Sequence, residues 1–171
     1  MKNQNELFTL KYFAEFINGL GFDSVEVLDP HSNVSAALID NISIIEPTDI
    51  VSNLLQTVNA DGNTVLFFPD EGAMKRYSHI ASNCDVPYVF GMKNRDCTGE
   101  ILGLDVIGET DVVSGKNILI VDDICSRGGT FLHSAKALKA MGANDIDLYV
   151  SHLENSVWDG EMIKSGLVRN I

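Results

Sequence analysis

Short apolar runs alternate along the chain with amphipathic stretches, and the spacing of the apolar positions predicts which stretches are strands and which are helices. Between residues 7 and 17 apolar side chains recur every three or four positions, the period of a helix with one buried face. Residues 65–68 and 118–121 are instead continuously apolar and β-prone, which is typical of strands buried on both faces of a parallel sheet. The same criteria predict further strands at residues 25–28, 42–45, 87–90, 101–107 and 146–150, and further helices at 48–57, 74–82, 130–141 and 157–164.

This alternation predicts an α/β fold of three layers, in which a mostly parallel, twisted sheet has helices on both faces. The chain contains no internal repeat, linker or low-complexity tract, so we expect a single domain over residues 1–171. Ligands of such folds lie beyond the carboxyl ends of the strands. The polar loops that should gather there are residues 29–31, 69–73, 91–96 and 122–130. Residues 91–100 as a whole are polar and flanked by glycine, which predicts an exposed, mobile loop.

The composition argues against several classes of function. The chain has 24 acidic and 12 basic residues, a formal net charge of −12 and no basic stripe, so we do not expect a nucleic acid as partner. Its apolar runs are far shorter than the ~20 residues of a membrane helix, and no secretory leader is apparent, so we expect no membrane partner and a cytoplasmic location. The cysteines, Cys84, Cys97 and Cys125, are odd in number and lack CxxC spacing, which argues against a disulfide framework or a zinc site.

Residues 118–130 carry the most specific chemistry in this sequence. The buried strand ends in two adjacent carboxylates, Asp122 and Asp123, and a short loop with Gly128 and Gly129 then leads into a helix. Glycines let backbone amides approach a phosphate, and the N-terminus of a helix adds a partial positive charge. Carboxylates would repel that phosphate unless they face sugar hydroxyls or a metal ion, so the pattern favours a sugar phosphate with Mg²⁺. The plainer alternative is a capped helix after a strand, with the carboxylates in solvent.

This stretch resembles the loop that binds phosphoribosyl diphosphate (PRPP) in the type I phosphoribosyltransferase fold. The resemblance implies that the acidic pair contacts the ribose hydroxyls and that the following loop holds the 5-phosphate. The residues of this implied site are Asp122, Asp123, Ser126, Arg127, Gly128, Gly129 and Thr130. Ser126 and Arg127 depart from the Asp and Thr that the family commonly has there. A larger group on the 5-oxygen of the sugar therefore stays open as an alternative.

Residues 68–76 narrow the resemblance to the ribose-phosphate diphosphokinases (PRPP synthetases) of the same fold. They are similar to the loop with which these enzymes contact a diphosphate, including a basic residue on the following helix. The residues that this implies for binding the diphosphate of ATP or PRPP are Asp70, Gly72 and Arg76. Since the other motifs follow in the family's order, the resemblance covers nearly the whole chain.

Residues 91–95 and 29–31 resemble two more segments of these enzymes. The first is similar to their catalytic loop, which implies that Lys93 and Arg95 are catalytic. The second is similar to a segment whose histidine lies near ATP and a metal ion, which implies that role for His31. Two plainer interpretations stay open: solvated charges on a loop for Lys93 and Arg95, and a histidine that caps the next helix for His31.

The resemblance implies an enzyme that transfers diphosphate from ATP to ribose 5-phosphate and so makes PRPP. The implied partners are ATP and ribose 5-phosphate or PRPP, and the implied cofactor is Mg²⁺, with His31 and Asp122 as ligands. Catalysis of such a transfer is mainly positioning and electrostatic stabilisation of a negatively charged transition state. Members of the family assemble into homo-oligomers, for which Leu7, Phe8 and Phe16 are candidate contacts. The favoured alternative is that at least two of these side chains are buried in the core.

The chain resembles the second half of such an enzyme, and the segment that grips adenine would fall before its first residue. Whether the chain is active alone is therefore open. One alternative is a phosphoribosyltransferase that uses PRPP as donor to a base, because the Gly-Gly-Thr loop serves both reactions. A second alternative is a non-catalytic module that binds PRPP or another sugar phosphate.

Overall fold

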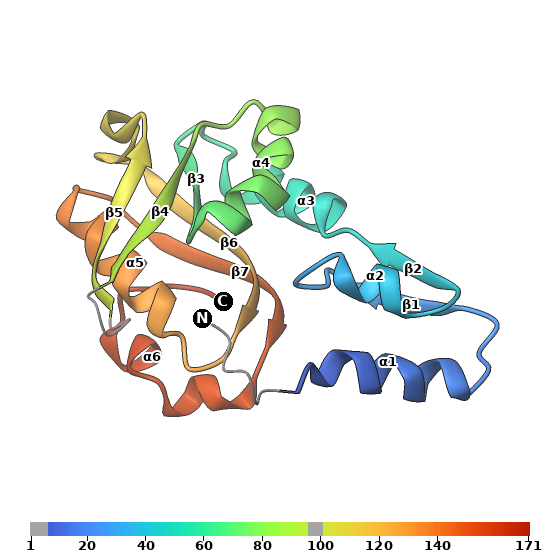
Figure 1. The fold of residues 1–171 in the computed structure, drawn as a ribbon. Helices are drawn as coiled ribbons and strands as arrows, with labels where there is room; N and C mark the ends of the chain where they lie inside the picture. The colour runs from blue at the N-terminus through green and yellow to red at the C-terminus, as the bar shows by residue number, and fades with distance from the viewer. Residues whose placement is uncertain (1–6, 96–100) are drawn as a thin grey trace. The chain divides into compact units, whose positions relative to one another are not determined.

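The computed structural model describes residues 7–95 and 101–171, with the backbone alone at residues 93–95, 101 and 102. Contacts within the chain group it into two compact units, Met1–Pro47 and Thr48–Ile171 (Figure 1). The expectation of a single domain over residues 1–171 stays a prediction. No helix in the described part of the chain is both long and apolar enough to cross a membrane.

The described part of the first unit contains two helices and two strands, and the apolar pattern predicts all of them except the second helix. They are α1 (Thr9–Gly19), β1 (Val25–Leu28), α2 (Val34–Leu38) and β2 (Ile42–Ile45). The two strands run parallel, with Val25 opposite Ile42. They form a sheet of their own, separate from the sheet of the second unit.

The second unit is built on a five-stranded sheet in the order β5-β4-β3-β6-β7. Its strands are β3 (Thr64–Phe68), β4 (Tyr88–Arg95), β5 (Ile101–Gly108), β6 (Asn117–Cys125) and β7 (Ile146–Leu153). All neighbours are parallel except β5, which runs antiparallel to β4. Every residue of β3 is buried, which confirms that its apolar run is a central strand covered on both faces.

Helices cover both faces of this sheet, which confirms the predicted three-layer α/β fold (Figure 1). The helices α3 (Thr48–Val58) and α4 (Glu71–Cys84) lie on one face, and α5 (Gly129–Ala140) and α6 (Glu161–Ser165) lie on the other. Successive residues of a strand point to opposite faces. Leu66 and Phe68 of β3 therefore pack in the core cluster of α3 and α4, whereas Val65 and Phe67 pack in the cluster of α5.

The expectation of a loop over residues 91–100 is wrong for residues 91–95, which continue β4. Backbone pairing with β5 explains the difference, because it satisfies the polar backbone of a stretch in which Met92 is the one apolar side chain. Gly91 is required at this point, since a Cβ there would lie 2.7 Å from the carbonyl oxygen of Pro69 and 2.9 Å from Leu104. Residues 96–100 lie outside the described part of the chain.

β6 is also longer than its apolar run indicates. It pairs with β7 as far as Cys125, opposite Leu153, so the expectation of a loop at residues 122–125 is wrong. The connection to α5 is therefore limited to residues 126–128. The helix expected at 157–164 is interrupted at Gly160, where the 3₁₀ helix η2 (Asn155–Asp159) ends and α6 begins.

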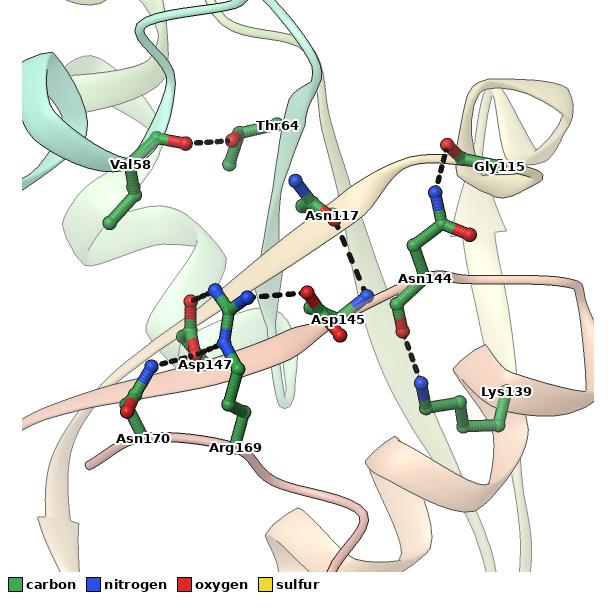
Figure 2. A network of polar contacts seen from close by, with 10 residues as sticks. All are labelled: Val58, Thr64, Gly115, Asn117, Lys139, Asn144, Asp145, Asp147, Arg169 and Asn170. Atoms are coloured by element: carbon green, nitrogen blue, oxygen red, sulfur yellow. Dashed lines mark hydrogen bonds and ion pairs between the residues drawn. The ribbon is translucent and has the colours of Figure 1, made fainter.

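A polar network fastens the end of the chain to the amino end of β7, at the edge of the sheet away from the predicted site (Figure 2). Arg169 donates from Nε to Oδ1 of Asp147 over 3.0 Å and from Nη2 to Oδ2 over 2.6 Å, and it also pairs with Asp145. Asn170 donates to Asp147 over 2.9 Å and forms a parallel β-bridge with it. These contacts fix the segment that follows α6 along the outer edge of β7.

Candidate functional site

Asp122 and Asp123 lie on the last part of β6, where successive side chains point to opposite faces of the sheet. Asp123 lies two residues after Val121, on the face that α4 covers, and only 4% of its side chain is exposed. Its Oδ2 atom accepts a hydrogen bond of 3.0 Å from Nη1 of Arg76. Asp122 lies two residues after Ile120, on the face of α5, and is half-buried. The acidic pair is therefore divided between two environments.

Burial is the main cause that raises the pKa of Asp122 from 3.8 to about 7. The carboxylates of Asp123 and Asp70 act in the same direction. The backbone N–H of Asp123 acts against them, since it donates to Oδ1 of Asp122 over 3.0 Å. A cation or hydroxyl donors beside Asp122 would favour its ionised form. The surroundings of this carboxylate are therefore suited to a ligand that brings either.

We expect the free energy of unfolding to fall as the pH rises from about 4 to about 7, because folded Asp122 keeps a proton that the unfolded chain has lost. The full rise in pKa corresponds to about 4 kcal/mol, and we expect about 2 kcal/mol because the side chain is partly exposed. Urea unfolding at several pH values should show this decline for the wild type, relative to Asp122→Asn. Parallel pH profiles of the two proteins would contradict the raised pKa.

The segment after β7 packs against the loop between β6 and α5, through Gly160 and Met162. Gly128, at the N-cap of α5, has a left-handed φ of 77°, and a Cβ there would lie 2.9 Å from atoms of Met162. A Cβ on Gly160 would lie 2.0 Å from the carbonyl oxygen of Arg127. A Cβ on Gly129, by contrast, would meet nothing within 4 Å. The loop is therefore packed on one side and open at the first residue of α5.

The side chains of the loop are mostly exposed. Arg127 adds a positive charge to it, at a position where the resemblance leads us to expect threonine. The hydroxyl of Ser126 is hydrogen-bonded to that of Ser156 over 3.0 Å, and Ser156 donates to Glu154 over 3.2 Å. Thr130, in the first turn of α5, accepts a hydrogen bond from the Ser134 hydroxyl at its carbonyl oxygen. Ser126 would therefore have to exchange a protein partner in order to bind a phosphate.

Cys125, which ends β6 directly before this loop, is buried. Burial, and then the charges of Asp122 and Glu154, raise the pKa of the Cys125 thiol to about 11. The thiol therefore stays protonated at neutral pH, and the thiolate that nucleophilic chemistry needs is absent at this position.

We expect Gly160→Ala to lower the free energy of unfolding by about 2 kcal/mol or more. A methyl group cannot stand 2.0 Å from a backbone oxygen, so the loop or η2 must move. Chemical denaturation measures the loss. The matched control is Gly129→Ala, which adds the same methyl group in open space and should change stability by less than about 0.5 kcal/mol. Equal losses in both variants would contradict the packing of the loop.

The predicted diphosphate-binding residues lie at the start of α4, directly after β3. Asp70 is the N-cap of α4, and its Oδ1 atom accepts a hydrogen bond of 3.0 Å from the backbone N–H of Ala73. Gly72 leaves room for this cap, since a Cβ there would lie 3.2 Å from the same oxygen. Arg76, one turn farther on, pairs with Asp123. The structure thus brings Asp70 and Arg76 together with the acidic pair, and the cap is a role that the sequence analysis missed.

The predicted catalytic residues, Lys93 and Arg95, lie on the last part of β4, opposite Leu104 and Ile101 of β5. The description of both is limited to the backbone. The preceding residues of β4 border a pocket of about 440 Å³ that is lined by Asp70, Glu71, Phe90, Gly91, Met92 and Ile107. Because β3, β4 and β6 are parallel, these backbone positions lie at the same edge of the sheet as the acidic pair.

His31 lies in the first unit, shortly after β1, and is exposed. Its role in binding ATP or Mg²⁺ stays a prediction. Among residues 7–95 and 101–171, no group of three or more His, Cys, Asp or Glu side chains could hold a metal ion. Asp122 nevertheless fits a Mg²⁺ ion that is shared with a substrate. Mg²⁺ prefers oxygen ligands, keeps several waters and is usually bound through one or two carboxylates together with substrate phosphates.

Comparison with solved structures shows the fold of the chain. The phosphoribosylpyrophosphate synthetase of Mycobacterium smegmatis superimposes with a TM-score of 0.70 at 23% identity, over 87% of this chain and 47% of that one. A purine phosphoribosyltransferase of Pyrococcus horikoshii superimposes with a TM-score of 0.52 at 15% identity, over 79% of this chain and 81% of that one. Both likenesses confirm the type I phosphoribosyltransferase-like architecture.

Comparison with known sequences confirms the resemblance to ribose-phosphate diphosphokinases. The chain is 32% identical over 148 residues to the ribose-phosphate pyrophosphokinase of Brucella melitensis, over 83% of this chain and 45% of that protein. It is 32% identical over 135 residues to that of Pyrococcus abyssi, over 78% of this chain and 46% of that protein. The chain thus spans less than half the length of these relatives. The family model for the phosphoribosyl transferase domain matches residues 38–162, and the chain belongs to this family.

Proposed function

We propose that the chain binds ribose 5-phosphate or PRPP at the carboxyl edge of the five-stranded sheet and transfers diphosphate from ATP to ribose 5-phosphate. One observation carries the proposal: two carboxylates lie on the last part of the buried strand β6, and within a few residues a loop with two glycines leads into the helix α5. The relatives that are named ribose-phosphate pyrophosphokinases support the reaction.

The two parts of this edge suit the two parts of a sugar phosphate. The half-buried carboxylate of Asp122 can accept hydrogen bonds from ribose hydroxyls, which is favourable because charge-assisted bonds are stronger than neutral ones. The backbone around Gly129 is open, and the N-terminus of α5 adds its partial positive charge for the 5-phosphate. Arg127 supplies a full positive charge on the same loop.

The transfer moves negative charge from ATP to the sugar. The anomeric hydroxyl oxygen forms a bond to the β-phosphorus, AMP leaves, and the hydroxyl proton passes to solvent. Lys93 and Arg95 stabilise the charge on the transferred group, with Arg95 as a planar fork and Lys93 as a point charge. Mg²⁺, when bound, would neutralise and polarise the phosphates, and Asp122 would hold it, with His31 as the second proposed ligand.

Three finer properties belong to the same proposal. We propose that the protein is cytoplasmic, because the relatives are named as enzymes of soluble substrates and the described helices are too short or too polar to span a membrane. We also propose that it forms a homo-oligomer, to which Leu7, Phe8 and Phe16 of the first unit contribute. The substrates would be ATP and ribose 5-phosphate, with PRPP as the product.

The test is turnover by the 171-residue chain with ATP, ribose 5-phosphate and Mg²⁺, measured as AMP formation. We expect AMP to form, and to fall by at least about 100-fold in Lys93→Ala and in Arg95→Ala, since charge stabilisation of this kind is worth about 3 kcal/mol. Release of diphosphate from PRPP in the presence of a base, without AMP formation from ATP, would instead assign a phosphoribosyltransferase. Binding of ribose 5-phosphate without either reaction would assign a non-catalytic module.

A further inference from the structure

The guanidinium group of Arg76 is held between a buried carboxylate and an aromatic ring. Its Nη1 atom lies 3.0 Å from Oδ2 of Asp123, whose side chain is 4% exposed. Its Cζ atom lies 4.7 Å from the ring centroid of Tyr77, and Nη2 donates to the Tyr77 hydroxyl. Three quarters of the Arg76 side chain is itself out of solvent. The guanidinium therefore has defined partners within the protein before any ligand arrives.

This arrangement gives the acidic pair a fixed geometry. Two adjacent carboxylates at the end of a buried strand repel each other, and a buried charge needs a partner. Arg76, on the neighbouring helix α4, provides that partner for Asp123 through an ion pair. The backbone N–H of Asp123 in turn donates to Oδ1 of Asp122 over 3.0 Å. The orientation of the Asp123 carboxyl group is therefore linked to the position of Arg76, and that of Asp122 to the backbone at Asp123.

We propose that Arg76 is a positioning residue for the sugar, which acts by holding Asp123 in place, and that it is not a direct ligand of the diphosphate. The proposal rests on the proposed function, because it assumes that the acidic pair binds the ribose hydroxyls. Arginine suits the position better than lysine, since its planar fork can bond Asp123 and the Tyr77 hydroxyl at once while it stacks on the ring.

Ribose 5-phosphate separates the two roles, because it contains the sugar but no diphosphate. Isothermal titration with Mg²⁺ should show at least about 10-fold weaker binding of ribose 5-phosphate to Arg76→Gln than to the wild type. Lys75→Gln is the matched control: it removes a cation from the same helix, but this lysine is 66% exposed and paired only with Glu71 among the contacts described. We expect its affinity to match the wild type. Unchanged binding to Arg76→Gln, with weaker binding of ATP alone, would overturn the proposal.

Two further variants separate positioning from loss of the fold. Arg76→Lys keeps the charge and should recover part of the affinity for ribose 5-phosphate. Arg76→Gln combined with Asp123→Asn should bind no more weakly than Asp123→Asn alone, because the same contact is already lost. Fully additive losses would show that Arg76 acts independently of Asp123 and would overturn the proposal. Failure of the wild type to bind ribose 5-phosphate would refute the proposed function itself, which distinguishes the two cases.

Discussion

Replacement of both Asp122 and Asp123 by asparagine should abolish Mg²⁺-dependent binding of ribose 5-phosphate and of PRPP, with a loss of at least about 100-fold. Hydrogen bonds to charged groups contribute about 1.5–3 kcal/mol each, and a tenfold change in affinity corresponds to about 1.4 kcal/mol. Asparagine keeps the size of the side chains, so the variant removes the charge without leaving a cavity. Isothermal titration of the wild type and the double variant, with and without Mg²⁺, measures the effect.

The control for this result is a second double variant that makes the same two substitutions elsewhere. Asp85 ends α4 in a left-handed conformation that asparagine also tolerates, and Asp111 lies on the 3₁₀ helix η1 (Thr110–Val113). Both are exposed. Asp85→Asn with Asp111→Asn should bind ribose 5-phosphate like the wild type. Retained binding in the Asp122/Asp123 double variant would remove the proposed sugar site.

Replacement of Arg76 by methionine should lower the free energy of unfolding by about 3 kcal/mol. Loss of one partner leaves a buried charge uncompensated, which costs about 3–5 kcal/mol, and we expect the lower end because 26% of the Arg76 side chain is exposed. Urea denaturation measures the loss. Asp123→Asn in the same protein should restore part of the stability, since the charge that lacks a partner is then gone.

Lys75→Met is the comparison for that experiment. The ion pair of Lys75 with Glu71 spans 2.8 Å, but both side chains are about two thirds exposed, and such surface pairs contribute less than about 1 kcal/mol. We therefore expect a change of less than about 0.5 kcal/mol. Similar losses in Lys75→Met and Arg76→Met would contradict the special role of the buried pair.

The framework of the fold could be predicted from the sequence because its central strands are unambiguous. The runs at residues 65–68 and 118–121 are apolar at every position, and only a strand with helices on both faces buries such a run. The ends of strands were harder to predict. Residues 91–95 and 122–125 are not continuous apolar runs, and they become strands because neighbouring strands offer backbone partners, which no local pattern reports.

The residue types of the candidate site follow from the sequence, but the contacts among those residues do not. The sequence shows an acidic pair, then two glycines, then a predicted helix, and the resemblance implies roles for Asp70 and Arg76. That Arg76 pairs with Asp123 depends on α4 lying against β6, a contact between residues 47 positions apart. The supporting role of Gly160 and Met162 depends likewise on where the last helix packs. A glycine between two acidic residues was a signal for Gly160, but it gave no indication of what the glycine touches.

The fastening of Arg169 to Asp147 has a consequence for the opposite end of the sheet. The stretch that leaves β7 is tied to Cys125 at its beginning, through the Glu154 amide, and to Asp147 at its end, and its middle presses on the carbonyl of Arg127. The stretch is thus anchored at both ends, so the loss of either contact should loosen its packing against Arg127 in the middle. Substitution of Arg169 should therefore loosen the loop at residues 126–128, although Arg169 itself lies at the amino end of β7.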